Sequence, residues 1–386
     1  RARAMLVAAL GLVVRARPAL LAPGLPPGLR SAPTPRLAPA PTPGLGIGPP
    51  LTPALVRSGA AAAARGSARP LRERSRLRLS ASSEPPEPPE PIALPAYPVN
   101  IYIEDTDAFA VTYYANYVRF FERAAYAWLG GRACGELMRA QGHLLGVEAL
   151  DGLKYADAAL LGDACEVRGA FTGLEGGVLS LRAALVRASD GRELCSCARL
   201  ELGFRDRNGA LLTEWPLPPP PQLAAGLPMP AAGAALVPPA ASESPTLVTL
   251  QADEVSGHGS LSMHAALRYF ERHRTAFIGG PDALAALQAS GTVVVVARLT
   301  QGRLLDAARG AAIGDTLSLR MDMTLRARGT QVLFEQFLFT AAGELAASAA
   351  VTCLCIDPVR GRMVPAPPEL QAQLELASLD GCCQLE

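Results

Sequence analysis

Three acidic residues stand just ahead of an apolar, aromatic segment that is predicted to be helical. Glu104, Asp105 and Asp107 open the stretch IEDTDAFAVTYYANYVRFFERA, which begins at Ile103. A carboxylate placed before a helix lies near the positive end of the helix dipole and near backbone N–H groups that have no partner inside the helix. Those N–H groups can stabilise the oxyanion that forms as a carbonyl carbon becomes tetrahedral, while the carboxylate attacks that carbon or deprotonates a water. The stretch is therefore compatible with a site for chemistry at a carbonyl carbon; the other interpretation is that its acids only cap the helix.

A second stretch, DEVSGHGSLSMHAALRYFER, is a diverged copy of the first. Aligning FFER (120–123) with YFER (269–272) matches the two acidic openings without a gap, at an offset of 149 residues. Further along, LLGD (160–163) falls against AIGD (312–315). Both parts of the chain thus share the order acidic turn, helix, strand, GD turn and further strands, which predicts a tandem repeat.

The elements that must position these residues are a long helix and a set of strands in each repeat. After the amphipathic helix, runs such as EVRGAFTG, VLSLRAALVRA and ELCSCARLELGFR alternate apolar and polar residues, with Gly-Asp and Arg-Asn-Gly turns as hairpin signals. This order predicts an α+β fold in which one helix packs on an antiparallel sheet, once in each repeat.

Two proline-rich stretches divide the chain. SEPPEPPEPIALP is typical of a stiff polyproline tether, and the stretch that begins PLPPPPQLAAGLP is almost free of charge, as expected of a linker. The predicted segments are a leader (1–82), a tether (83–95), a first domain (96–215), a linker (216–246), a second domain (247–370) and a tail (371–386).

The leader has the composition of a targeting segment. Residues 1–72 contain ten arginines and no acidic residue, and the apolar run MLVAALGLVV is too short to span a bilayer but suits a signal peptide. A signal peptide followed by a transit peptide would suit a plastid reached through the secretory route, with a mitochondrion as the alternative. The other interpretation is a leader that carries no targeting signal. No later stretch is long and apolar enough for a membrane span.

Composition excludes several classes of protein. The formal net charge is +1 and the basic residues do not cluster outside the N-terminus, so no nucleic-acid partner is expected. The eight cysteines form no CxxC pair and no Cys/His zinc pattern, so no metal or cofactor is expected. With 49% hydrophobic residues the chain can bury two cores.

The motif DTDAFAVTYYANYVRFFERA resembles the signature of the hotdog-fold thioesterases of the 4-hydroxybenzoyl-CoA thioesterase type, and YADAALLGD (155–163) is similar to the strand and turn that follow it in that family. The resemblance implies two tandem hotdog domains, each an antiparallel sheet wrapped around a central helix, packed as an intramolecular pseudo-dimer. It also implies hydrolysis of acyl-CoA or acyl-carrier-protein thioesters without a cofactor, since a thiolate is a good leaving group.

The same resemblance assigns roles to single residues. Asp107 falls on the family's catalytic aspartate, as nucleophile or general base, and Tyr114 on the position whose backbone N–H polarises the carbonyl. Asn116 and Tyr113 are expected to bind substrate, and Glu122 to reach the acyl pocket. The family's turn glycine is replaced by alanine at position 110, and its histidine by Tyr114. Of the remaining acids, Glu104 and Asp105 are predicted to be solvated.

The second repeat lacks the aspartate, because the 149-residue offset puts Ser256 opposite Asp107. We therefore expect it to supply one wall of a pocket whose carboxylate comes from the first repeat. Two other functions stay open: a hydratase or dehydratase that uses His258 with Glu271, and a non-catalytic protein that binds acyl thioesters. The double-hotdog unit could also form a homo-oligomer.

Overall fold

The computed structural model describes residues 92–107, 110–220, 223, 235–239, 245–255, 260–368, 370–372 and 383–385. All of these belong to one compact unit. The predicted leader, most of the tether and linker, and both Ser256 and His258 lie outside the described residues. Targeting to a plastid and a histidine-based dehydration therefore stay predictions.

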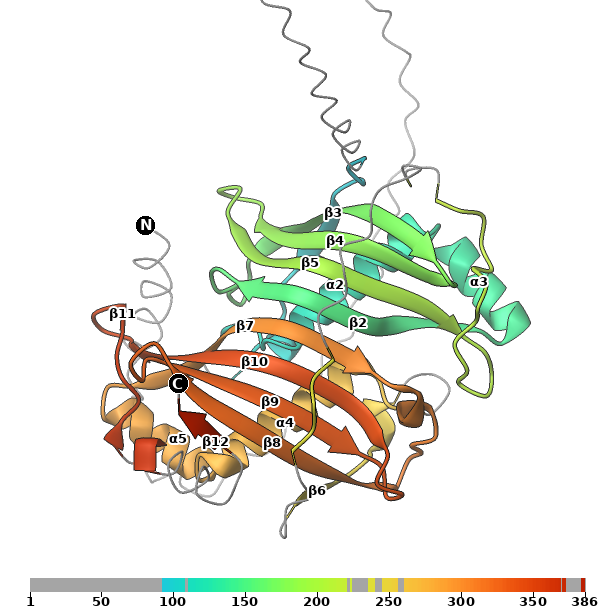
Figure 1. Cartoon of the computed structure of the whole chain (residues 1–386). Coiled ribbons are helices and arrows are strands. Elements are labelled where there is room, and N and C mark those ends of the chain that lie inside the picture. Colours follow the sequence, from blue (N-terminus) through green and yellow to red (C-terminus); the bar gives the residue numbers. More distant parts are fainter. Residues whose placement is uncertain are drawn as a thin grey trace, which may run out of the picture. The chain divides into compact units, whose positions relative to one another are not determined.

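The first repeat begins with a short strand and a 3-10 turn, continues through two helices and ends with four long strands (Figure 1). Its elements are β1 (Tyr97–Asn100), η1 (Ile103–Asp105), α2 (Asn116–Trp128), α3 (Arg132–Gln141), β2 (Leu144–Tyr155), β3 (Ala164–Glu175), β4 (Val178–Arg187) and β5 (Glu193–Arg205).

The second repeat follows the same order, which confirms the predicted tandem α+β architecture. Its elements are β6 (Thr246–Thr249), η2 (Ala252–Glu254), α4 (Met263–Phe277), α5 (Gly280–Ala289), β7 (Val293–Leu304), η3 (Asp306–Arg309), β8 (Thr316–Arg326), β9 (Gln331–Phe339), β10 (Leu345–Asp357), β11 (Arg362–Met363) and β12 (Cys383–Leu385).

One sheet runs through both repeats, and its centre is the antiparallel pair β2–β7. The strand order is β1-β3-β4-β5-β2 in the first repeat and β7-β10-β9-β8 in the second, with β6 beside β8. Leu150 pairs with Gly302, and Leu153 pairs with Leu299. Under the 149-residue offset Leu299 corresponds to Leu150 and Gly302 to Leu153, so equivalent strands meet about a twofold axis, as in the isologous interface of a homodimer.

A salt bridge reinforces this central strand pair. The guanidinium of Arg303 donates to both carboxylate oxygens of Asp151 at 2.8 Å, and to the carbonyl oxygen of Leu150 at 3.1 Å. Bidentate pairs of this kind fix geometry as well as adding energy. The pair therefore helps to set the register in which the two repeats join.

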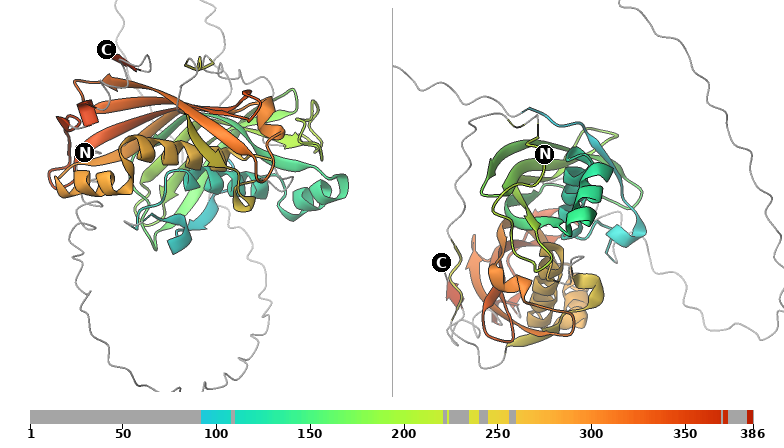
Figure 2. Two further views of the ribbon diagram at one scale, coloured as in Figure 1. Left: turned by 90° about the horizontal axis from the view of Figure 1, so that it is seen from below. Right: turned by 90° about the vertical axis from the view of Figure 1, so that its right-hand side faces the viewer.

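The two central helices lie on the same face of the sheet (Figure 2). Spacings of three and four residues place Tyr117, Phe120, Phe121 and Ala124 on one side of α2, where all are buried. This row packs α2 against its own strands, and α4 packs in the same way against strands that include β9 and β10. After α2, Gly130 has a φ of 97°, a conformation that ends the helix and that other residues rarely adopt.

Three elements were not predicted. Each repeat contains a second helix, α3 or α5, after the central helix, and β12 pairs in parallel with β8 although it lies in the predicted tail. In α3 only Cys134 and Met138 are buried, and α5 buries none of its residues. The α5 sequence has only a weak apolar period, whereas α3 is amphipathic and its period was overlooked. No helix in the described part of the chain is both long and apolar enough to cross a membrane.

Candidate functional site

The acidic turn of the first repeat is fastened to the start of α2 by its main chain. The carbonyl oxygen of Asp105 accepts the Tyr113 N–H at 2.9 Å and the side-chain amide of Asn116 at 3.0 Å. Further along the turn, the Thr112 N–H donates to the carbonyl oxygen of Ala159 at 2.8 Å. These bonds hold the turn between the beginning of the central helix and the loop that precedes β3.

The prediction that Asp105 is solvated is wrong. Its side chain is buried, and its Oδ2 accepts the backbone N–H of Tyr102 at 3.1 Å, which closes the 3-10 turn η1. A carboxylate in this position satisfies a main-chain donor that would otherwise be lost on burial. Glu104, by contrast, is exposed, as predicted.

Glu254, the counterpart of Asp105 in the second repeat, has the same structural role. It is also buried, and its Oε2 accepts the backbone N–H of Gln251 at 3.3 Å and the hydroxyl of Tyr269. Its other oxygen forms an ion pair with Arg272 at 2.5 Å. The acid at this position therefore holds a turn together in both repeats. The prediction of a solvated Asp105 missed this structural role.

Asp107 lies two residues beyond η1, at the start of a tight turn, and is exposed. Its N–H donates to the carbonyl oxygen of Val111 at 2.8 Å, and its Oδ1 accepts the Val111 N–H at 3.3 Å. Inside this turn Ala110 has a φ of 57°, the left-handed conformation that glycine adopts most easily. The turn thus has the backbone shape expected where the family has glycine, and it holds a solvent-accessible carboxylate on a fixed main chain.

Tyr114 brings an unused main-chain donor to the start of α2. No described residue accepts a hydrogen bond from its N–H. The N-cap of α2 is Ala115, whose side chain cannot cap the helix, so the donors of the first turn are not satisfied in that way. The N–H groups of Asn116 and Val118 donate instead to the carbonyl oxygens of Tyr113 and Ala115, so the Tyr114 N–H is the donor left for a developing oxyanion.

The Tyr114 side chain, by contrast, is committed to packing. Its hydroxyl donates to the carbonyl oxygen of Leu267 in α4, and Arg274 lies 5.2 Å from the centre of its ring. Burial raises the pKa of Tyr114 to about 12. Burial, followed by the proximity of Tyr114 and Glu271, also raises the pKa of Tyr113 far above its usual value. Both tyrosines are therefore neutral at physiological pH.

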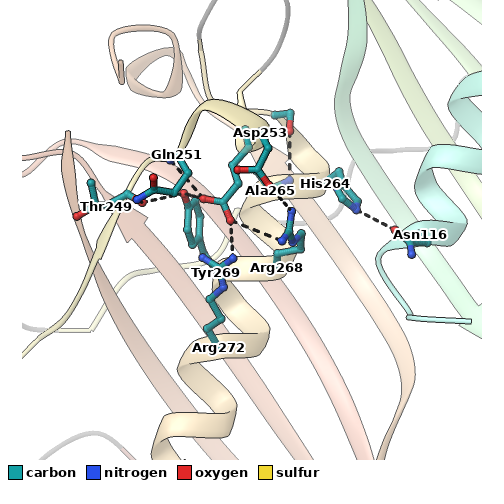
Figure 3. Close-up of polar contacts among 11 residues, drawn as sticks. Asn116, Thr249, Gln251, Asp253, His264, Ala265, Arg268, Tyr269 and Arg272 are labelled. Carbon is teal, nitrogen blue, oxygen red and sulfur yellow. Dashed lines mark hydrogen bonds and ion pairs between the residues drawn. The ribbon is translucent and has the colours of Figure 1, made fainter. Parts of the chain in front are cut away.

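Asn116 is the first residue of α2 rather than its cap, and its side chain connects the two repeats. While its Nδ2 donates to the acidic turn, its Oδ1 lies 3.0 Å from the Nε2 of His264 in α4 (Figure 3). Burial, together with the charges of Arg119 and Arg268, lowers the pKa of His264 to about 4. The histidine is thus neutral at physiological pH and donates through Nε2 to Asn116.

Glu122 lies elsewhere, in a cavity of about 500 Å³ that both repeats line. The first repeat contributes residues of α2 and β2, and the second contributes the segment 260–264 at the start of α4. None of the other four predicted site residues, Asp107, Tyr113, Tyr114 and Asn116, lines this cavity. Burial raises the pKa of Glu122 to about 7, against the opposing effect of Arg119 and Arg123. The five residues assigned from the sequence therefore lie in two places: Glu122 lines this cavity, and the other four lie in the acidic turn and at the start of α2.

The glutamate that faces the acidic turn of the first repeat comes from the second repeat. Glu271 acts electrostatically on both Tyr113 and Tyr114, and it forms an ion pair with Arg274, whose side chain is 3% exposed. Since Glu271 is the repeat counterpart of Glu122, each central helix presents its glutamate to the turn of the opposite repeat.

Three side chains that line the cavity were not singled out from the sequence. Arg119, His264 and Arg268 all line the cavity, yet each lies in an ordinary helical sequence. Only His264 has a local signal that could have drawn attention to it, namely its position at the start of a helix. Among the described residues, no group of three or more histidine, cysteine or acidic side chains is placed to hold a metal ion.

Comparisons with known proteins define the fold. No family model matches the sequence, and no curated protein matches it. Among solved structures, the chain is similar to a putative oleoyl thioesterase from Lactobacillus plantarum, with a TM-score of 0.52 and 10% identity over 72% of this chain and 98% of that one. It is also similar to the 12:0-ACP thioesterase from Umbellularia californica, with a TM-score of 0.51 and 9% identity over 68% of this chain and 94% of that one.

At this level of identity the likeness establishes architecture. The chain consists of two hotdog domains in tandem, joined through β2 and β7 into one sheet, as the resemblance of its first motif implied. Both similar structures are matched over almost their whole length, so the correspondence extends to the pair of domains and not to one domain alone.

Proposed function

We propose that this protein hydrolyses acyl thioesters, with Asp107 as the reacting carboxylate and the N–H of Tyr114 as an oxyanion donor. The observation that carries the proposal is the clamp between the acidic turn and α2, because it holds an accessible carboxylate on the same rigid segment as an unbonded N–H. The two similar structures are a putative oleoyl thioesterase and a 12:0-ACP thioesterase, which supports the same reaction class here.

The chemistry follows from these two groups. With Asp107 as general base, the carboxylate takes a proton from a water whose oxygen attacks the thioester carbon. The negative charge that moves to the carbonyl oxygen is stabilised by the Tyr114 N–H, a fixed donor that needs no reorganisation. Collapse of the tetrahedral intermediate breaks the carbon–sulfur bond and releases a free acid and a thiolate, which then takes up a proton. With Asp107 as nucleophile, the carboxylate oxygen attacks first and water cleaves the resulting anhydride.

Both coenzyme A and acyl carrier protein are compatible carriers, since the reacting groups contact only the thioester. Among acyl groups, aliphatic and aromatic chains are both candidates. A panel of short, long and aromatic acyl-CoAs, with acyl-carrier-protein thioesters alongside, separates these possibilities by their kcat/KM values.

The test of the reacting carboxylate is the Asp107→Asn variant, with Glu104→Gln as a matched control in the same turn. Loss of a general base typically lowers kcat by about 10²–10⁴-fold. We expect this loss for Asp107→Asn, and nearly unchanged hydrolysis for the control, because Glu104 is exposed and three residues away. Hydrolysis that persists unchanged in Asp107→Asn refutes the mechanism. Acyl-thioester binding without turnover by the unmodified chain refutes the activity itself.

A further inference from the structure

The cavity that contains Glu122 lies at the helix start of the second repeat, not at the acidic turn. Its lining segment 260–264 corresponds, at the 149-residue offset, to 111–115 in the first repeat. The volume of about 500 Å³ is within the range of sites that hold small molecules. The chain has therefore kept a ligand-sized space at the repeat whose sequence has no counterpart of Asp107.

The lining of this cavity is apolar over one part and cationic over another. The apolar part is formed by Val118, Tyr126, Leu145, Leu261, Met263 and Leu304. The cationic part is formed by Arg119 and Arg268, each on one of the central helices, with the neutral His264 beside them. A ligand that fits both parts is an amphiphile with an anionic head.

The two arginines lack close carboxylate partners in the described part of the chain. Arg268 is paired only at the limit of ion-pair distance, at 3.7 Å from Asp253 and 3.9 Å from Glu254, and Glu254 is already bound closely by Arg272. For Arg119 the described residues include no ion-pair partner. By contrast, Arg205, which also lines the cavity, is fully engaged with Glu148. Arg119 and Arg268 are thus the cations with capacity for a ligand.

The acidic groups of the cavity do not cancel this charge. Asp253 is largely exposed to solvent, with 74% of its side chain accessible, so water screens it. Burial raises the pKa of Glu122 to about 7. Near neutral pH its carboxyl is therefore protonated in a large share of the molecules, and there it can donate a hydrogen bond.

We propose that this cavity is a second ligand site, which binds a medium- or long-chain monocarboxylate with its head between Arg119 and Arg268 and its chain along the apolar lining. The site is separate from Asp107 and does not require the hydrolysis proposed above. A free carboxylate of this kind is also the class of product that hydrolysis of an aliphatic acyl thioester releases.

The experiment uses the full chain and dodecanoate, with binding measured by calorimetry. We expect saturable binding that weakens about tenfold or more in Arg119→Gln and in Arg268→Gln, since each removes a charge-assisted hydrogen bond to the head group. The matched control is Arg123→Gln, one turn further along α2 and outside this cavity, which should change the Kd less than about twofold. Dodecanol, which lacks the charge, should bind at least about tenfold more weakly than dodecanoate.

The Asp107→Asn variant separates this proposal from the proposed activity. Dodecanoate binding that is unchanged in Asp107→Asn supports a separate site, whether or not that variant hydrolyses thioesters. Three results overturn the proposal: no saturable binding by the unmodified chain up to about 1 mM, equal affinity for dodecanol and dodecanoate, or binding that Asp107→Asn weakens while Arg119→Gln leaves it intact.

Discussion

The strongest quantitative expectation concerns Glu122, a partly buried carboxylate on α2 that lines the cavity between the repeats. Burial raises its pKa from the ordinary 4.5 to about 7, and the nearby Arg119 and Arg123 only partly offset that effect. Ionising this side chain in the folded protein is therefore costly. Replacing this glutamate by glutamine keeps the size of the side chain and removes its charge. The Glu122→Gln variant therefore measures the free-energy cost of ionising Glu122 in the folded protein.

The direction of the effect follows from proton binding in the two states. Below pH 4.5 the carboxyl is protonated in both the folded and the unfolded chain, and its ionisation does not affect stability. Between pH 4.5 and pH 7 the unfolded chain releases the proton while the folded chain keeps it, so the free energy of unfolding falls as pH rises. At 1.36 kcal/mol per pKa unit the full shift corresponds to about 3 kcal/mol, and partial exposure reduces this to about 2–3 kcal/mol.

Urea unfolding at pH 5, 6, 7 and 8, followed by circular dichroism, measures this directly. We expect the difference in unfolding free energy between Glu122→Gln and the unmodified chain to grow with pH, until the variant is about 2–3 kcal/mol more stable at pH 8. The control is Glu175→Gln, which removes an exposed carboxylate at the end of β3 and should show no such trend. A difference that does not change between pH 5 and pH 8, or that favours the unmodified chain at pH 8, refutes the buried-carboxylate argument.

Three further variants test the acidic turn. Ala110→Gly should raise the free energy of unfolding by about 0.5–1 kcal/mol in urea titrations, because the φ of 57° strains alanine, whereas Ala127→Gly within α2 should lower it by about 1 kcal/mol. Tyr114→Phe should lower stability by about 1–2 kcal/mol but leave kcat within a few-fold, since only the hydroxyl is lost and the main-chain donor stays. Asn116→Ala should lower both thermal stability and kcat by removing two hydrogen bonds, whereas a purely structural role would lower only the former.

Much of the fold was predictable because its signals are local and occur twice. The central helix is marked by apolar residues three and four apart, and the tandem architecture by the repeat itself. The expectation that the Gly-Asp turns form hairpins is wrong, because the strand that follows each turn, β3 or β8, does not pair with the long strand that precedes it. The same turn closes in both copies: Leu160 donates to the side chain of Asp163, and Ala312 donates to that of Asp315. The neighbour order of the strands was not predictable in this way, because periodicity specifies which face a residue occupies and not which strand lies beside it.

The candidate site was only partly predictable, and the acids of the turn show why. Asp105 and Asp107 are two residues apart in the same turn, yet one is buried beneath a main-chain donor and the other is exposed. Nothing local distinguishes them, because burial of Asp105 depends on contacts with the start of α2 that form only in the folded domain. The resemblance to a family motif selected Asp107, and physical chemistry of the sequence alone would have treated both acids alike.

The twofold arrangement at β2 and β7 explains the remaining difference between prediction and structure. In an alignment of the repeats Glu122 and Glu271 are equivalent, and each follows the turn of its own repeat in the sequence. The antiparallel seam brings each central helix against the start of the other, so each glutamate serves the turn of the opposite repeat. Each structural unit therefore combines one turn with the helix of the other repeat. In one such unit Glu271 is held by Arg274 beside the turn that carries Asp107. In the other, Glu122 has no such partner among the described residues and lines an open cavity. The repeat whose sequence lacks a counterpart of Asp107 is thus the one that has the cavity, which is why we propose ligand binding there and hydrolysis at the other turn.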